Sequence, residues 1–339
     1  LDSAWKCAVG RAHPVSAPTH LSNPEAFTMK DIRQIAPEVT RIPTGISNAY
    51  LVGNSDQWVL IDCGTQGYAD TITEAAERRF GHDNPPECIY LTHGHFDHAG
   101  SASDLAEQWG VSIFAHRLEL PFVDGREKYP PPDPTVGGFM SQMVRLIPNQ
   151  KIDLSDYVEE LPNRKLPGLD GWERIHTPGH TPGHVSFYRK SDGVLIAGDA
   201  FTTINQDNMF ELVSKRPQVC RPPAYYTSDW EQAQESVRKL AKLKPDLLAA
   251  GHGEPFAGRE ALRGLQRLAQ DIQAPPRGRY VERPVETDAD GINYLPPAPP
   301  DPVKRTATAV ALGGAALGLG VYLRKRQMSR RSPWEKYAA

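Results

Sequence analysis

Residues 91–100, LTHGHFDHAG, bring together side chains that commonly bind metal ions. They hold His93, His95, Asp97 and His98 within six positions. His93 and His95 would point to the same side of an extended chain, while Asp97 and His98 follow in the turn, so the cluster can reach two points in space. A single histidine is usually a surface residue or a hydrogen-bonded core residue. Crowding these groups together without a metal would bring titrating side chains into contact, so the spacing predicts metal binding.

Further candidate ligands follow later apolar runs of the chain. His180 and His184 lie in HTPGHTPGHVSF, Asp199 ends the predicted strand in VLIAGDA, and His252 ends the last predicted strand in LLAAGHGEP. Each is weak evidence alone, but together they place a ligand-type residue at the end of each run, as a site built on the strand ends of an α/β domain requires. Imidazole and carboxylate ligands without a thiolate suit zinc, with iron or manganese possible.

Alternating strands and helices are expected to position these residues. Short apolar runs bounded by glycine or polar residues predict core strands at residues 49–52, 58–62, 88–93, 111–115, 185–189, 194–197 and 247–250. Helical spacing predicts helices at residues 68–80 and 101–109, and a capping box of Ser228 and Glu231 opens a third that runs to about residue 243. This order predicts a large α/β domain.

The domain boundaries follow from changes in composition. Residues 1–28 show no secretory pattern and are expected to be a disordered extension, and residues 29–273 are expected to form the catalytic domain. Prolines in residues 117–170 indicate an inserted, lid-like segment. Beyond the domain we expect a C-terminal tail, with a proline-rich linker at residues 274–305, a transmembrane helix at residues 306–323 and a basic tail at residues 324–339.

Composition narrows the partners and the compartment. The 339 residues have a formal net charge of -3, which disfavours a nucleic-acid-binding surface, and the four cysteines are scattered as in a reducing compartment. The uncharged segment 306–323, followed by basic residues, predicts a membrane-associated protein with a C-terminal anchor. We therefore expect the catalytic domain in the cytoplasm, a small-molecule substrate and no nucleic acid. The sequence does not predict the oligomeric state.

The motifs VLIDCG, THGHFDH, TPGHTPGH, AGDA and AAGHGEP occur in an order that resembles the metallo-β-lactamase superfamily, particularly its glyoxalase II-like hydrolases. The resemblance covers about residues 38–265. It implies a four-layer αββα sandwich, in which two mixed sheets lie between helices and the metals lie at one edge. With this resemblance the fold class is α/β, with the lid-like insertion and the C-terminal tail added to the sandwich.

The resemblance also implies a role for each candidate residue. One metal would be held by His93, His95 and His180, the second by Asp97, His98 and His252, and Asp199 would bridge the two. Asp62 and His184 would support the ligands from behind. Two divalent ions, most simply zinc, would share a hydroxide that attacks a thioester, ester or lactone, and Asp97 would act as the catalytic residue that orients it.

Several alternatives remain open at this point. An aspartate at position 199 disfavours β-lactam hydrolysis, and Thr202 stands where related lactonases carry a tyrosine. An iron-dependent, persulfide-dioxygenase-like enzyme and a binding protein without catalytic activity are the other function classes. An apolar pocket or simple packing would equally explain a set of large side chains, namely Phe122, Tyr129, Phe139, Met140, Phe201, Tyr225 and Tyr226.

Overall fold

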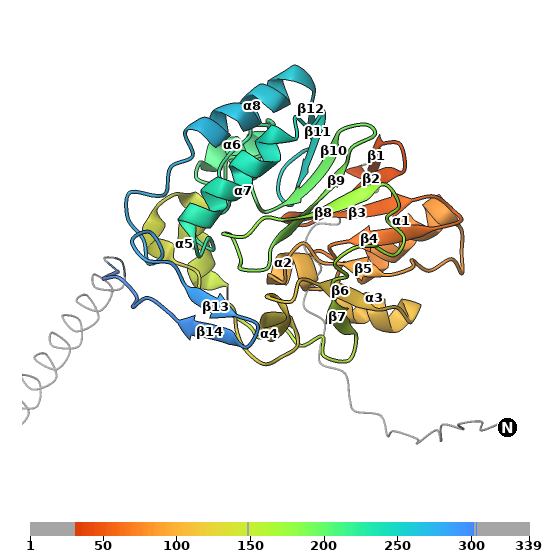
Figure 1. Cartoon of the computed structure of the whole chain (residues 1–339), viewed down its shortest axis with the longest axis horizontal. Coiled ribbons are helices and arrows are strands. Elements are labelled where there is room, and N and C mark those ends of the chain that lie inside the picture. Colours follow the sequence, from red (N-terminus) through yellow and green to blue (C-terminus); the bar gives the residue numbers. More distant parts are fainter. Residues whose placement is uncertain (1–30, 148, 302, 304–339) are drawn as a thin grey trace, which may run out of the picture.

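The computed structural model describes residues 31–147, 149–301 and 303, and two β-sheets face each other at its centre (Figure 1). The first sheet follows chain order through β1 (Arg33–Ala36), β2 (Val39–Thr44), β3 (Ser47–Gly53), β4 (Trp58–Ile61), β5 (Ile89–Tyr90), β6 (Ile113–Ala115) and β7 (Val158–Glu160). The second has the order β12 (Phe256–Ala257), β11 (Leu247–Ala250), β10 (Val194–Gly198), β9 (Val185–Arg189) and β8 (Trp172–His176). Both sheets mix parallel and antiparallel pairs.

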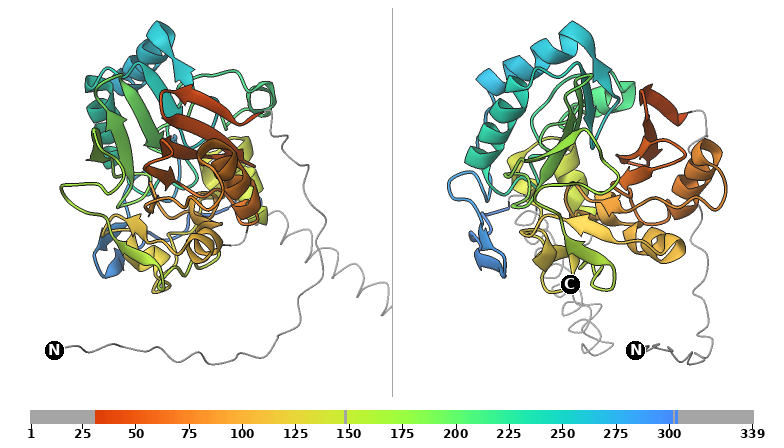
Figure 2. Two further views of the ribbon diagram at one scale, coloured as in Figure 1. Left: turned by 90° about the vertical axis from the view of Figure 1, so that its right-hand side faces the viewer. Right: turned by 45° about the vertical axis from the view of Figure 1, so that its right-hand side comes forward.

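Helices cover the outer face of each sheet (Figure 2). The first sheet packs on α1 (Ala69–Phe80) and α3 (Ala102–Trp109), and the second on α7 (Trp230–Lys242) and α8 (Gly258–Gln270). Successive side chains of β4 point to opposite faces of the first sheet. Trp58 and Leu60 pack against the helices, while Val59 and Ile61 pack against the second sheet. The predicted four-layer αββα sandwich is confirmed.

Shorter helices lie in the connections near one edge of the sandwich. They are α2 (Phe96–Ala99), α4 (Leu120–Val123), α5 (Phe139–Met143) and α6 (Met209–Ser214), with 3-10 turns η2 (Pro134–Val136) and η3 (Val144–Leu146). The parallel pairs β4·β5 and β10·β11 end at this edge. Because carboxyl ends of parallel strands meet at the same edge, the loops that follow them are brought together there.

The proline-containing segment 117–170 does not lie wholly outside the sandwich. Its last part forms β7, which pairs in parallel with β6 at the end of the first sheet. The rest forms α4, α5 and the two 3-10 turns. Only three residues long and partly exposed, β7 carries little hydrophobic pattern of its own. A lid function for the remainder stays a prediction.

Residues 274–301, which we call the C-terminal strap, pack on the domain instead of forming the expected free linker. Their hairpin consists of β13 (Glu286–Asp288) and β14 (Gly291–Tyr294). The Tyr280 side chain is 3% exposed, and its hydroxyl donates to the Pro131 carbonyl at 2.6 Å. The backbone N–H of Val285 donates to the Ser228 carbonyl at 3.1 Å. Proline restricts the backbone in both linkers and packed extended segments, so composition could not distinguish the two.

The strap contacts predict a measurable contribution to stability. We expect Tyr280→Ala to lower the free energy of unfolding by about 3 kcal/mol, since a buried aromatic ring is lost. Tyr280→Phe keeps the ring but loses the bond to Pro131, and should cost only about 1 kcal/mol. Urea unfolding of both variants checks this, and wild-type stability in Tyr280→Ala would show that the strap does not support the domain.

The predicted membrane anchor is corrected by the structure. None of the helices in the described part of the chain combines the length and the apolar character that crossing a bilayer requires. The segment 306–323 itself lies outside the described residues, as do residues 1–28 and 324–339. Its alanines and glycines contribute little to the free energy of membrane insertion, which is why an uncharged stretch alone was a weak predictor. The expected membrane association and localisation are withdrawn with the anchor.

Candidate metal centre

The candidate ligands meet at the sandwich edge where strands of both sheets end. Asp62 directly follows β4, Asp199 directly follows β10, and His252 comes shortly after β11. The loop after β5 and the short helix α2 carry His93, His95, Asp97 and His98, whereas the loop between β8 and β9 carries His180 and His184. All of these side chains are buried.

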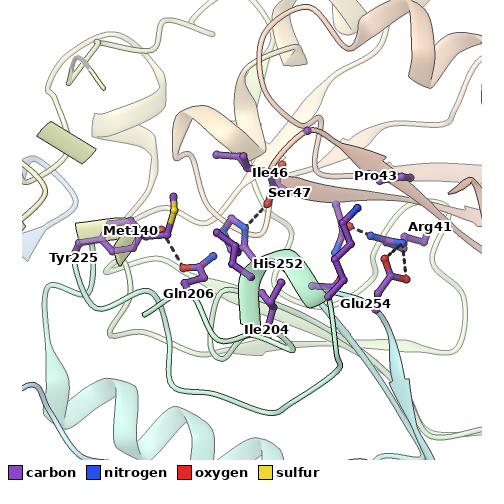
Figure 3. A pocket seen from close by; sticks show the side chains of 15 residues that line it. Arg41, Pro43, Ile46, Ser47, Met140, Ile204, Gln206, Tyr225, His252 and Glu254 are labelled. Atoms are coloured by element: carbon purple, nitrogen blue, oxygen red, sulfur yellow. Dashed lines mark hydrogen bonds and ion pairs between the residues drawn. The ribbon is translucent and has the colours of Figure 1, made fainter. Parts of the chain in front are cut away.

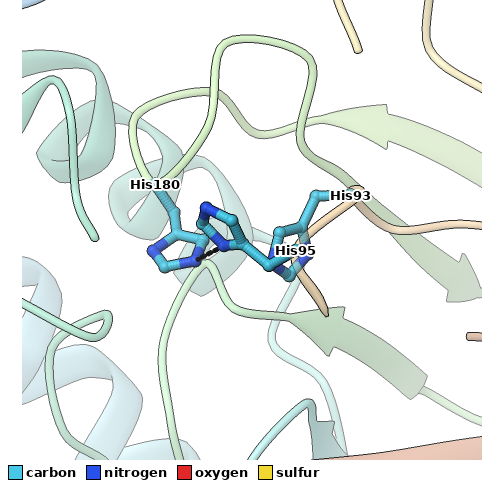
Figure 4. Close-up of side chains that lie close together, drawn as sticks. All are labelled: His93, His95 and His180. Atoms are coloured by element: carbon cyan, nitrogen blue, oxygen red, sulfur yellow. Dashed lines mark hydrogen bonds between the residues drawn. The ribbon is translucent and has the colours of Figure 1, made fainter. Parts of the chain in front are cut away.

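Three histidines form the first group, shown in Figure 4. The ligand atoms of His93, His95 and His180 lie within 4.8 Å of one another. His95 Nδ1 and His180 Nε2 lie 3.0 Å apart. Two nitrogens that bind one tetrahedral zinc ion at about 2.0–2.1 Å would lie about 3.3 Å apart. The group therefore has the dimensions of a single metal site.

Asp97, His98 and His252 form a second group within the same limit. His252 Nε2 lies 3.5 Å from Asp97 Oδ2. Asp199 lies between the two groups: its Oδ2 is 3.0 Å from His252 Nε2 and 3.5 Å from His180 Nε2, and its Oδ1 is 3.6 Å from His98 Nε2. A carboxylate in this position can contact a cation in either group.

Hydrogen bonds behind the site orient two of the imidazoles. Asp62 Oδ2 accepts from the Thr92 hydroxyl and from His98 Nδ1, both at 2.8 Å. Because the Thr92 proton is directed at Asp62, its oxygen accepts from His93 Nδ1 at 3.1 Å. Both rings therefore carry hydrogen on Nδ1 and turn Nε2 toward the centre. Partners of this kind raise the basicity of metal-binding histidines and hold their orientation.

Unsatisfied polar atoms at the centre fit a bound cation. Among the described residues, His93 Nε2, His98 Nε2 and Asp199 Oδ1 are buried without a hydrogen-bond partner, and these residues form one group within 4.8 Å. Each such atom costs about 1–3 kcal/mol if nothing satisfies it. His252 Nδ1 donates to the Ile46 carbonyl at 2.7 Å, so its Nε2 also faces the carboxylates. Divalent cations at the two ligand groups would satisfy these atoms.

The pKa values of two imidazoles at the centre, His95 and His98, are shifted in opposite directions. Burial lowers the pKa of His95 to about 3, although Asp199 opposes the shift, so this ring is neutral and able to bind metal. Burial would also lower the pKa of His98, but Asp199, Asp62 and Asp97 outweigh it and raise the pKa to about 10. These carboxylates favour a proton at His98, and a metal ion could replace it.

His184 supports the backbone of Asp199. Its Nε2 accepts the N–H of Asp199 at 2.8 Å, which leaves Nδ1 to donate to the Thr177 hydroxyl at 2.8 Å. The ring is fully buried, and burial lowers its pKa to about 3. It is absent from the ligand groups of the described residues. The structure thus places His184 behind the site.

Glu119, a buried glutamate that links the histidine loops, was not predicted from the sequence. Its Oε1 accepts from the Thr181 hydroxyl and the Gly183 N–H, both at 2.7 Å. Its Oε2 accepts from the Gly94 N–H at 3.2 Å and from the Tyr129 hydroxyl. It therefore joins the loop between the first two histidines to the loop that follows β8. A single glutamate in the sequence LELPF gives no motif that could have found it.

The four donors around Glu119 predict an effect on metal affinity. In Glu119→Gln, an NH₂ group replaces one carboxylate oxygen and faces N–H or O–H donors, which it cannot accept. The two loops should therefore shift relative to each other. We expect metal to bind at least about tenfold more weakly, as for other groups that orient ligands. Competition with a chromophoric chelator measures this, with Glu107→Gln on the exposed face of α3 as control. Equal affinities in both variants would exclude the linking role.

Aromatic residues flank His95 in the first group. The ring centroids of Tyr129 and Tyr226 lie 4.6 Å and 4.4 Å from that of His95. Phe122 stacks on Tyr129 with a centroid distance of 4.6 Å. Phe122 is thus one layer removed from the candidate ligands, and the two tyrosines limit the space around the first group.

The other large side chains lie in different places, some at a cavity and some not. Met140 and Tyr225 line a cavity that also contacts His252 (Figure 3). Phe201 is instead fully buried in the core beneath α7 and α8, so packing explains it. Phe139 is not among the residues that line this cavity. Of these four residues, only Met140 and Tyr225 therefore line this cavity.

Comparison with known protein families agrees with this geometry. The profile of the metallo-β-lactamase superfamily matches residues 42–252, which include every candidate ligand. The chain belongs to the metallo-β-lactamase superfamily. The resemblance inferred from the five motifs is confirmed, and membership implies divalent metal ions at the His and Asp cluster.

Relatives within the superfamily include named hydrolases. The probable metallo-hydrolase YflN of Bacillus subtilis (strain 168) is 40% identical over 234 residues, covering 68% of this chain and 89% of YflN. The hydroxyacylglutathione hydrolase GloC of Haemophilus influenzae (strain ATCC 51907 / DSM 11121 / KW20 / Rd) is 31% identical over 169 residues, covering 49% and 68%. The crystal structure of the BLEG-1 B3 metallo-β-lactamase matches with a TM-score of 0.47 and 23% identity, covering 70% and 98%. The glyoxalase II-like resemblance thus extends to named relatives.

Proposed function

We propose that the chain is a dinuclear metal-dependent hydrolase of thioesters, esters or lactones. The observation that carries the proposal is the pair of ligand groups that share Asp199 around three unpartnered buried polar atoms. Two divalent ions bound there would lower the pKa of a shared water to about 7, supply hydroxide and polarise the scissile carbonyl. The imidazole and carboxylate donors favour zinc, with iron or manganese as alternatives.

Asp97 is the residue to which we assign the orientation of the attacking water. Its carboxylate lies beside His252 and His98 at the second group, where it can accept a hydrogen bond from that water. Its backbone carbonyl accepts from the Ser47 hydroxyl at 2.5 Å, and its side chain is nearly buried. A fixed acceptor next to the nucleophile favours one direction of attack.

No protein nucleophile is needed for this reaction. Cys63 follows Asp62 in the chain, but it is fully buried, and burial raises the pKa of its thiol well above the ordinary value. A protonated, inaccessible thiol is inert. We therefore assign the nucleophile to water.

The complete second ligand group favours hydrolysis over the other function classes. An iron-dependent, persulfide-dioxygenase-like enzyme would need one metal site, yet Asp97, His98 and His252 converge beside the first group. A binding protein without catalytic activity would retain costly unpartnered atoms for no gain.

Activity against a substrate panel tests the proposal. Zinc-loaded protein should hydrolyse thioesters, aryl esters or lactones, lose this activity with a chelator and regain it with zinc. Phosphodiesters serve as the contrasting substrate class, and oxygen uptake with a persulfide tests the iron-dependent alternative. Hydrolysis of phosphodiesters alone, or oxygen uptake without ester hydrolysis, would contradict the proposal.

A further inference from the structure

A cavity of about 220 Å³ opens beside the second ligand group (Figure 3). His252, a member of that group, forms part of its wall. The other walls come from the turn between β2 and β3, from α5, from the loop after β10 and from α6. A substrate group in this cavity would therefore be attached close to the reacting carbonyl.

The walls next to His252 are mostly apolar. The apolar lining side chains are Ile46, Met140, Ile204, Leu212 and Tyr225, and the remaining lining includes Gln206 and Lys215. Ile204 and Tyr225 are buried, whereas Ile46 is 48% exposed and lies at the opening. Apolar walls bind apolar ligand surface with about 25 cal/mol for each Å² removed from water. The cavity thus favours a hydrocarbon group.

The charged end of the cavity is already paired within the protein. Arg41 contacts Glu254 at 2.8 Å, and its Nε donates to Asn48 Oδ1 at 2.8 Å. The Arg41 side chain is only 8% exposed. A guanidinium held by a carboxylate and an amide offers little net charge to a ligand. Arg41 therefore does not select for an anion.

We propose that this cavity binds the acyl chain of the substrate and selects unbranched chains of about eight carbons. The inference rests on the proposed hydrolase function and adds the substrate class to it. An apolar cavity of about 150 Å³ holds benzene, so a volume of about 220 Å³ holds roughly eight or nine carbon atoms. The opening at Ile46 allows the chain to enter from solvent.

A series of thioesters from acetyl to dodecanoyl tests the proposal on the zinc-loaded full chain. Burial of one methylene is worth about 0.8 kcal/mol, which corresponds to a three- to fourfold change in kcat/KM. Octanoyl thioester should therefore exceed acetyl thioester by at least about 100-fold. Beyond about ten carbons the gain should stop, because the cavity is filled. The same kcat/KM for every chain length would overturn the proposal.

Two substitutions on α6 provide a matched pair. Leu212 lines the cavity, whereas its neighbour Val213 is 76% exposed and does not. Leu212→Trp should reduce the octanoyl-to-acetyl ratio at least about tenfold, since the indole occupies space needed by two or more methylenes. Val213→Trp should leave the ratio unchanged. An equal ratio in both variants would assign chain selection to another surface.

Binding measured without turnover separates this inference from the proposed function. Calorimetry with acetate and octanoate on the zinc-loaded protein should give at least about 30-fold tighter binding of octanoate, and Leu212→Trp should remove most of the difference. If no thioester is hydrolysed but octanoate binds as expected, the hydrolase assignment fails and the acyl site stands. Octanoate that binds no tighter than acetate would refute the acyl site, whatever the activity.

Discussion

His95→Ala should lose ester or thioester hydrolysis by at least about 1,000-fold, because loss of the ion removes both water activation and carbonyl polarisation. His95 supplies one of the three nitrogens of the first group, and its Nδ1 lies 3.0 Å from His180 Nε2. Its ring contacts Tyr129, Tyr226 and His180 at the centre, outside the layers where the sheets pack on each other and on the helices. The variant should therefore remain folded.

Turnover, circular dichroism and metal content of the same preparation check this result. His82→Ala is the matched control, because His82 is an exposed histidine paired with Glu77 away from the candidate ligands. Wild-type turnover in folded His95→Ala would remove the first group from the mechanism. Loss of activity in His82→Ala would show that the effect is not specific to the centre.

Asp199→Asn should release the metal of the second group before that of the first. Two of the close contacts of Asp199 are to His252 and His98 in the second group, at 3.0 Å and 3.6 Å, and one is to His180. Burial would raise the pKa of Asp199, but His252 and His98 outweigh it and lower the pKa, so the carboxylate is ionised. Asparagine removes this charge while keeping the size, whereas three histidines alone can still hold zinc.

Metal content after dialysis shows whether Asp199→Asn loses one metal ion, both or neither. We expect about one equivalent in Asp199→Asn and at least about a 100-fold lower kcat, since a ligand and its charge are both lost. Asp83→Asn, in an exposed loop, should retain the wild-type content. Full occupancy of both sites in Asp199→Asn would show that the bridging position is wrongly assigned.

The sequence pattern predicted an α/β domain with candidate ligands at strand ends, and the resemblance of the five motifs implied the sandwich. Apolar runs such as VLI before Asp62 and LLAA before His252 mark strands that are buried on both faces. Their carboxyl ends converge in any sandwich of this kind, so the position of His252 beside Asp97 follows from the strand order. Candidate ligands that lie far apart along the chain could be predicted because each lies in a recognisable motif.

Features without a local pattern could not be predicted. Glu119 contacts Thr181 and Gly183 more than sixty residues away, and its importance comes only from that contact. The packing of the strap could not be predicted for another reason. Its prolines suggested a linker, while the buried Tyr280 ring and backbone hydrogen bonds such as that from Val285 to Ser228 hold it to the domain. The membrane prediction rested on an uncharged segment, residues 306–323, followed by basic residues, and this pattern alone does not establish that a segment spans a membrane.

Metal stoichiometry of the purified full-length protein tests the dinuclear assignment most directly. The chain should be stripped with a chelator, titrated with zinc and assayed on octanoyl thioester at each step. We expect two equivalents per chain, with hydrolysis that depends on the second equivalent, because the two ligand groups share Asp199. Saturation at a single equivalent with full activity, or hydrolysis by metal-free protein, would contradict a dinuclear metal-dependent hydrolase.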